Sequence, residues 1–397
     1  MDTLLIERVS AAAEALRAEL TEMSRTIHDN PELAGLTAPL AQRLQTELLG
    51  KYGFEVEENY CGFPTAYRAV YRGKRPGPKI AMLAEYDALP KLGHGCGHNL
   101  IAMMSVGAGI TMREFADEFG AEIYVYGTPA EETAGTKVEM SQRGVFRDMD
   151  VAMMAHPANE NSSSINSMAM VCRRFEFFGR AAHAAGAPEQ GLKALDAMIN
   201  FFNLINALRQ QTRDDARIHG VIKHGGDAPN IIPDYTSALF YIRSSKNAQL
   251  MKLMERVEEC ARGAALGTGT TVKITPDEVD FKDTCSNMYL SELACQQMEK
   301  LGVSMRRLGD APHMGSSDLG DVSYECPAIQ LYAWMGPPLR GKNYYGHTQE
   351  FAEMACTDTA FDNAMNFVKG FTMTAIELMT NPAHLAAIRE EFDRMER

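Results

Sequence analysis

The chain has 397 residues, 45% of them hydrophobic and 23% charged, with a formal net charge of −13. This length exceeds what one hydrophobic core usually serves, and the apolar content argues against disorder, so two compact domains are expected. A negative chain without Lys/Arg-rich runs is repelled by nucleic acid and anionic membranes, which leaves small molecules as the expected partners.

Features that bear on the cellular compartment point to the cytoplasm. The first 20 residues have a helical period that charges interrupt, which differs from a signal peptide. No apolar run is long enough to span a membrane, so no membrane helix is expected. The eight cysteines lack paired spacings, as is typical of a reducing compartment.

In chain order, residues 3–28 and 37–50 have the pattern of amphipathic helices, separated by the turn signal Asp29-Asn30-Pro31. Strand-like and helical runs then alternate to about residue 158. The most apolar strand-like runs are KIAMLAEYD (79–87), EIYVYGTPAEE (122–132) and DVAMMAHP (150–157). This alternation predicts an α/β domain with a mostly parallel sheet and helical crossovers.

The pattern changes near residue 170. Here the expected elements are a strand (171–179), a helix (191–211), two strands (217–226 and 235–245), a helix (247–266) and a strand (270–276). This βαββαβ order is that of a ferredoxin-like unit. Helical patterns return after Asp283, with a strand at 328–334 and a last helix from Thr357. The expected division is therefore 1–168 and 283–397 for the large domain, with 169–282 inserted.

Residues that bind metals or move protons follow the three apolar runs. Open α/β sheets carry their chemistry beyond the carboxyl ends of the strands, so these residues are expected in one crevice. Cys96 and His98 lie in the glycine-dense loop GHGCGHN, where Gly95 and Gly97 let the backbone turn both side chains toward one centre. His156 ends the third run, and His347 lies in a polar turn.

Two adjacent carboxylates, Glu131 and Glu132, follow the second run and Pro129. One can bind a metal while its neighbour stays free as a general base. Asp87 is a natural partner for a metal-bound histidine, and Glu85 is either structural or a further ligand. The candidate ligands Cys96, His98, Glu132, His156 and His347 suffice for two zinc ions that share a water.

Nine motifs occur in the order found in one family. They are IHDNPEL (27–33), EYDALP (85–90), GCGHN (95–99), PAEE (129–132), MMAHP (153–157), GRAAHAA (179–185), PNIIP (229–233), GSSDLG (315–320) and GHTQEF (346–351). With them the chain resembles the metallo-aminoacylase and carboxypeptidase family of dinuclear amidohydrolases. It most resembles the branch of auxin-conjugate hydrolases, aminobenzoyl-glutamate hydrolases and Xaa-Arg dipeptidases.

The resemblance implies roles for individual residues. It makes Cys96, His98, Glu132, His156 and His347 metal ligands and Glu131 the general base. It implies that His183, in the inserted lid and dimerisation domain, helps to stabilise the oxyanion, often from the partner subunit. Asn230 and Arg243 correspond to substrate-binding positions, and an arginine suits a two-point grip on a carboxylate.

The chain departs from the family pattern at two places. Many relatives have His-X-Asp where this chain has Glu85-Tyr86-Asp87, which leaves the bridging ligand and the number of metal ions open. Asn99 stands where many auxin-conjugate hydrolases have Asp, which favours the dipeptidase side of the branch.

The sequence therefore predicts a metal-dependent hydrolase of N-acyl amino acids or dipeptides that forms a homodimer through the inserted domain. Two divalent ions are expected, zinc first, with manganese or cobalt as alternatives. A non-catalytic metal-binding or carrier module and an amidase with Cys96 as thiol nucleophile are the competing hypotheses. The acyl group stays open, and Met103, Met104, Met335 and Trp334 are candidates either for its pocket or for the core.

Overall fold

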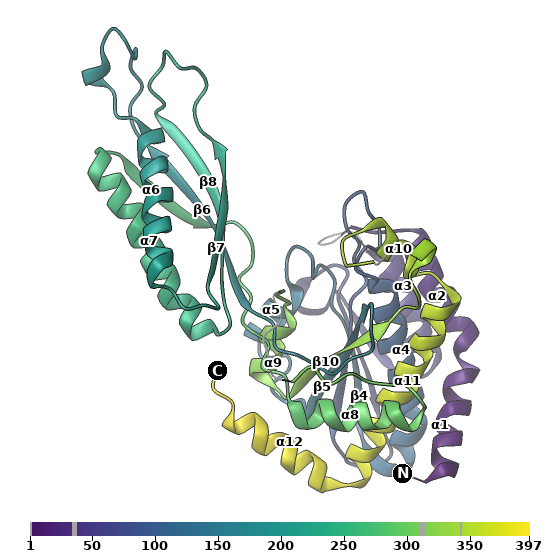
Figure 1. Cartoon of the computed structure of the whole chain (residues 1–397). Helices are drawn as coiled ribbons and strands as arrows, with labels where there is room; N and C mark the ends of the chain where they lie inside the picture. Colours follow the sequence, from purple (N-terminus) through teal and green to yellow (C-terminus); the bar gives the residue numbers. More distant parts are fainter. Residues whose placement is uncertain (1, 34–37, 310–314, 342–343) are drawn as a thin grey trace. The chain divides into compact units, whose positions relative to one another are not determined.

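The computed structural model describes residues 2–33, 38–309, 315–341 and 344–397. The described chain divides into two units. Residues 167–283 form the second unit, together with 315–317 and Arg397, and the other residues form the first. The second unit therefore interrupts the first in sequence (Figure 1). No helix of the described residues is long and apolar enough to cross a membrane.

The first unit contains a six-stranded sheet. Its strands in spatial order are β1 (Glu55–Glu58), β2 (Tyr67–Arg72), β4 (Glu122–Gly127), β3 (Lys79–Ala84), β5 (Val151–Ala158) and β10 (Ala328–Trp334). The four strands from β4 to β10 are parallel, and β1 and β2 are antiparallel. This confirms the predicted mostly parallel α/β sheet.

Helices cover both faces of this sheet. The helices of the first unit are α1 (Thr3–Ala15), α2 (Arg17–Asp29), α3 (Pro39–Lys51), α4 (His98–Phe115), α5 (Thr136–Gln142), α8 (Met288–Lys300), α9 (Leu319–Glu325), α10 (Gln349–Met354), α11 (Asp358–Thr380) and α12 (Pro382–Arg394). Ile80 and Met82 of β3 pack with α4 and α11 in one core, whereas Ala81 and Leu83 pack with α5 and α9 in another. Since both faces are buried, the residues of β3 that follow Lys79 are all apolar.

Helix boundaries differ from the expected ones at both ends of the chain. The prediction of a single helix over 3–28 is wrong, because the chain forms two helices here, α1 and α2, which meet at the buried Leu16. Residue 37 lies outside the described residues. The last helix begins after Thr357, whose hydroxyl accepts a hydrogen bond from the Ala360 N–H, and Pro382 then starts a separate helix because proline cannot continue α11.

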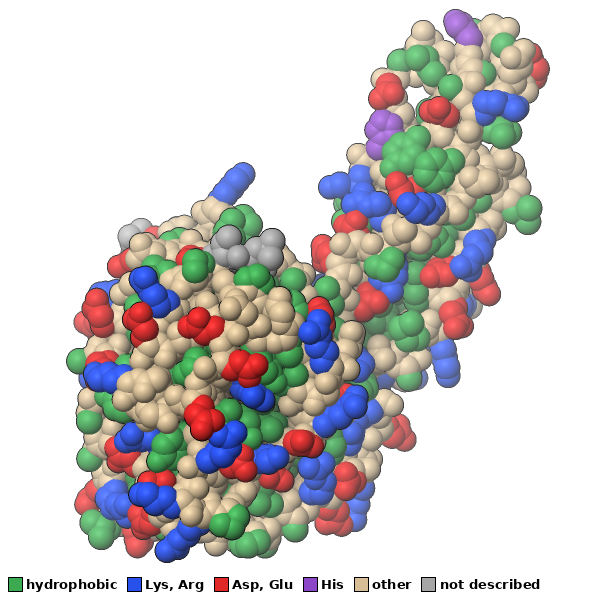
Figure 2. Space-filling view, turned by 180° about the vertical axis from the view of Figure 1, so that it is seen from behind, with side chains coloured by type: hydrophobic (Ala, Val, Ile, Leu, Met, Phe, Trp, Pro, Cys, Tyr) green, Lys and Arg blue, Asp and Glu red, His purple; other side chains and the backbone are tan. Residues whose placement is uncertain are grey.

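The second unit has the ferredoxin-like order of elements. Its sheet runs β7 (Arg217–His224), β8 (Tyr235–Ser244), β6 (Ala169–Phe178) and β9 (Thr271–Pro276), all antiparallel. Both helices, α6 (Ala194–Leu208) and α7 (Asn247–Thr268), cover one face (Figure 1). Phe175, Phe201 and Phe240 form an aromatic cluster between helices and sheet. Figure 2 shows charges of both signs interspersed on the face in view.

The end of β4 is closely packed, which gives a test of the fold. A Cβ atom added at Gly127 would lie 2.1 Å from the buried Tyr67 ring, whose hydroxyl donates to Gln45. We expect Gly127→Ala to destabilise the protein by about 1–3 kcal/mol, because the ring has no free space. Gly50→Ala in α3 is the control, since a Cβ there meets nothing within 4 Å. Urea unfolding measures both variants, and equal stability of the two would contradict this packing.

Candidate metal centre

The site lies where β3, β4 and β5 end. Ala84 pairs with Gly127, and Met82 pairs with Met153, so the three parallel strands finish at the same edge of the sheet. Glu85 follows β3 directly, and His156 belongs to the last residues of β5. This register is why side chains distant in sequence meet here.

Two backbone conformations with positive φ shape the loops at this edge. Gly97 (φ 71°) precedes α4, and a Cβ there would lie 2.9 Å from the Pro157 ring, so glycine permits the close approach of α4 to β5. Ala130 (φ 67°) is a non-glycine residue in the left-handed region. A hydrogen bond from the Gly135 N–H to the Ala130 carbonyl, 2.8 Å long, offsets the strain of this conformation. The turn at Ala130 directs Glu131 and Glu132 into the site.

The histidine ring orientations suit metal binding. His98 is fully buried, and its Nδ1 lies 3.1 Å from Asp87 Oδ1, so Nδ1–H donates to the carboxylate. Its Nε2 has no hydrogen-bond partner. His156 Nδ1 donates to the Pro157 carbonyl at 2.8 Å, which leaves its Nε2 available as well. A carboxylate or carbonyl behind the ring is the usual arrangement of a metal-binding histidine.

The donor atoms form neighbouring groups. In one, ligand atoms of Glu85, His98 and His156 lie within 4.8 Å of one another, and Cys96, Glu132 and His347 form another. Glu132 Oε1 lies between them, 3.9 Å from His98 Nε2 and 3.6 Å from His347 Nε2. The structure thus brings together all five predicted ligands.

The residues present fit divalent metal ions. Oε2 of Glu85 and Nε2 of His98 are buried and lack hydrogen-bond partners, which is costly unless a cation binds between them. Thiol, imidazole and carboxylate donors together are those that zinc prefers. Glu131 joins a further group with His98 and Glu132, so its carboxylate lies beside the donor atoms.

Burial and neighbouring charges shift the pKa values of the site. Burial raises the pKa of Glu131 well above its usual range, and Glu85 and Asp318 raise it further. Burial, followed by Glu132, likewise raises the pKa of the Cys96 thiol, so this cysteine is not a thiolate without a cation beside it. Burial alone would lower the pKa of His98, but the carboxylates of Asp87 and Glu85 raise it to about 10.

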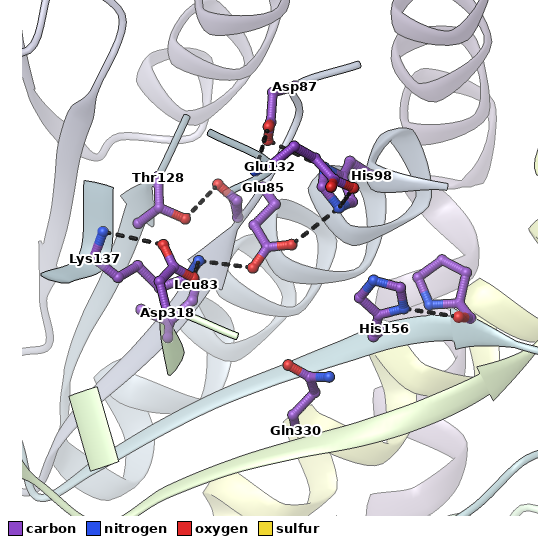
Figure 3. A network of polar contacts seen from close by, with 12 residues as sticks. Leu83, Glu85, Asp87, His98, Thr128, Glu132, Lys137, His156, Asp318 and Gln330 are labelled. Atoms are coloured by element: carbon purple, nitrogen blue, oxygen red, sulfur yellow. Dashed lines mark hydrogen bonds and ion pairs between the residues drawn. The ribbon is translucent and has the colours of Figure 1, made fainter. Parts of the chain in front are cut away.

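Sequence reasoning missed a buried lysine. Lys137, on α5, is fully buried, its Nζ lies 2.7 Å from Glu85 Oε1, and it also pairs with Asp318 (Figure 3). Asp318 belongs to the GSSDLG motif, which by itself indicates no role for this carboxylate. Nothing in TKVEM distinguishes Lys137 from a solvent-facing helix lysine, because lysine is rarely buried.

The other three predicted residues lie in the second unit. His183 is exposed, and its Nδ1 accepts a hydrogen bond from the Gly186 N–H at 3.0 Å, so Nε2 carries the proton and can donate. The Ala184 N–H donates to the Asn230 carbonyl at 3.0 Å, which holds this loop beside His183. Arg243, on β8, donates through Nη1 to Ser316 Oγ at 2.9 Å.

A pocket of about 510 Å³ opens beside His156 in the first unit. Most of its lining is apolar or aromatic, namely Pro157, Ile165, Leu308, Tyr332, Tyr344, Tyr345 and Phe351. Its polar lining includes Asn159, Glu160 and Ser162. The side chains of Met103, Met104 and Met335 are not part of this lining, since they are buried in the hydrophobic core.

Comparison with known proteins agrees with this geometry. Residues 166–268 match the peptidase dimerisation domain of the M20 family. Xaa-Arg dipeptidase of Mus musculus is 36% identical, over 97% of this chain and 90% of that protein. One of the subunits of the p-aminobenzoyl-glutamate hydrolase of Escherichia coli is 33% identical, over 70% of this chain and 61% of that protein.

A solved structure shares the fold. It is that of a dinuclear metal binding peptidase of the M20 family from Bacillus subtilis, with a TM-score of 0.67 and 18% identity, covering 92% of this chain and 99% of the other. The fold and the relatives define a metal-dependent hydrolase of the peptidase and amidohydrolase class. The chain belongs to the M20 family, with the Xaa-Arg dipeptidases among its relatives.

Proposed function

We propose that the protein hydrolyses the amide bond between an acyl group, or an N-terminal residue, and an amino acid with a free carboxylate. The observation that carries the proposal is the position of Glu131. Its carboxyl lies within 4.8 Å of donor atoms of His98 and Glu132, next to both groups of metal-binding side chains. The Xaa-Arg dipeptidase and p-aminobenzoyl-glutamate hydrolase relatives support dipeptides and acyl-amino acids as substrates.

Glu131 serves as general base and then as general acid. Divalent ions in this site supply a water of lowered pKa and an electrophile for the substrate carbonyl. Glu131 accepts the proton of the attacking water, and the same carboxyl returns a proton to the leaving amine nitrogen. Its raised pKa suits both steps, because a carboxyl that is too acidic would not hold the proton between them.

Other side chains position the substrate. His183, with its Nε2 proton free to donate, stabilises the negative charge that develops on the carbonyl oxygen. Arg243 binds the carboxylate of the leaving amino acid, and Asn230 assists in the same unit. The pocket beside His156 receives the acyl group, which favours an apolar or aromatic side chain because tyrosine and phenylalanine rings dominate its lining.

Zinc is the proposed metal, with manganese or cobalt as alternatives, because Cys96 and three histidines provide soft and borderline donors. A cytoplasmic location is proposed because the eight cysteines lack paired spacings, as is typical of a reducing compartment. The two competing hypotheses are not favoured. A carrier module does not explain Glu131, and burial keeps the Cys96 thiol protonated in the absence of a cation.

The first test is a hydrolysis screen. The purified protein is assayed on dipeptides and N-acyl amino acids, with and without chelator, while elemental analysis counts bound metal. We expect about two metal ions per chain and cleavage that chelator abolishes and added zinc, manganese or cobalt restores. Cleavage that resists chelator but is blocked by thiol alkylation would instead support Cys96 as nucleophile.

The general base is tested by Glu131→Gln. We expect turnover to fall about 10²-fold or more with metal content unchanged, because glutamine cannot accept the proton. Glu139→Gln is the matched control, since Glu139 lies nearby on α5 but pairs with Arg143 at the surface. Near-native turnover of Glu131→Gln with metal bound would show that another group is the base.

We further propose that the second unit forms a homodimer through its edge strand β7. This strand pairs with β8 on one side, and the other side is an open edge. Val221 and Ile222 expose 57% and 45% of their surface there, and the peptidase dimerisation domain model includes the strand. An exposed apolar edge strand is favourable for pairing with a second copy.

Charge placed on the edge strand tests the dimer. We expect V221K/I222K to shift the protein from dimer to monomer in sedimentation velocity, because lysine repels a second copy of the same strand. Leu4→Lys, at an exposed apolar position in α1, is the control and should leave the dimer intact. A wild-type protein that sediments as a monomer at assay concentration would contradict the proposed dimer.

A further inference from the structure

Glu85 occupies the position where a histidine ligand is common in the family, and its surroundings indicate what it does. The side chain is 1% exposed, and its two oxygens face different partners. Oε1 forms an ion pair with Lys137, and Oε2 lies 3.4 Å from His98 Nε2 (Figure 3). Neither Oε2 nor His98 Nε2 has a hydrogen-bond partner.

The spacing of these two atoms matches shared ligation. Donors about 2.1 Å from one tetrahedral zinc ion lie about 3.4 Å from each other. Nε2 of His156 faces the same group, because its Nδ1 is occupied by the Pro157 carbonyl. Three donors of suitable type therefore converge from β3, α4 and β5.

The charges lead to the same conclusion. Lys137 carries one positive charge, and the buried Asp318 already balances it through Nζ and through the Lys137 backbone N–H. Glu85 would then keep an uncompensated negative charge in a buried position, which is strongly unfavourable unless a cation binds there.

We propose that Glu85 is a ligand of the ion bound by His98 and His156, and that Lys137, held by Asp318, is the residue that positions it. Asp318 precedes α9, and Lys137 lies in the first turn of α5. The pair therefore joins two helices to the end of β3 and directs Oε2 toward the histidines. This inference rests on the proposed metal site, and it concerns ligation and not the substrate.

Metal loading with cobalt tests the ligand. Each apoprotein is loaded with Co²⁺, freed of excess metal and analysed for cobalt content and for the thiolate-to-cobalt absorption of Cys96. We expect two ions in the wild type and in the Glu139→Gln control. Glu85→Gln should keep one ion and the thiolate band while the other ion is lost. Two ions bound with wild-type affinity in Glu85→Gln would overturn the proposal, as would a wild type with fewer than two.

Two further variants complete the test. Circular dichroism shows whether Glu85→Gln folds, and if it does not, Glu85→Asp replaces it in the test. Glu85→Asp keeps the negative charge opposite Lys137 but shortens the side chain by one methylene, so the same loss of one ion is expected. K137M/D318N removes the positioning pair as a neutral unit. It should weaken the second ion about tenfold or more and leave the thiolate band unchanged. Unchanged affinity would refute the role of Lys137.

Wild-type activity separates this inference from the proposed function. Two bound ions without hydrolysis of any dipeptide or N-acyl amino acid would contradict the function and leave the ligand assignment standing. Hydrolysis by a Glu85→Gln variant that keeps both ions would contradict the ligand assignment and leave the proposed function standing.

Discussion

Parallel pairing of β3 with β4 on one side and β5 on the other brings the ends of three strands to one edge. The polar side chains that follow these strands are thereby placed near one another. The helices that cover both faces of the sheet shield them from water. Carboxylates, imidazoles and a thiol are consequently crowded at a buried edge. Such a group is stable only when cations or hydrogen bonds compensate the charges.

The structure meets this constraint in several ways at once. Asp87 holds His98 from behind and also accepts the Glu132 backbone N–H at 3.2 Å, which ties the loop after β4 to the end of β3. Lys137 and Asp318 compensate each other next to Glu85. The strained Ala130 is supported by a hydrogen bond from Gly135, just before α5. The proposed metal ligands, the proposed general base and the supporting ion pair therefore form one connected arrangement.

This arrangement shows how two adjacent glutamates can have the two different roles proposed for them. Glu132 lies between the two donor groups, at distances from His98 and His347 that suit a shared ligand. Glu131 is oriented by the same turn but lies among other carboxylates. Burial raises the pKa of Glu131 most, and the neighbouring carboxylates raise it further. Environment, and not residue type, separates a ligand from a proton carrier.

The sequence by itself determined the order of elements and indicated the candidate donors. Apolar runs identified β3, β4 and β5, and the βαββαβ pattern identified the inserted unit. Glu132 could be found because it closely follows a strand, and Cys96 and His98 because they lie in a glycine-dense loop. These are local signals, since hydrophobic period and strand ends depend on neighbouring residues in the chain. Only the tertiary structure decided which charges are buried and what compensates them. Lys137 could not be recognised because its partners, Glu85 and Asp318, lie 52 residues before it and 181 residues after it in the chain.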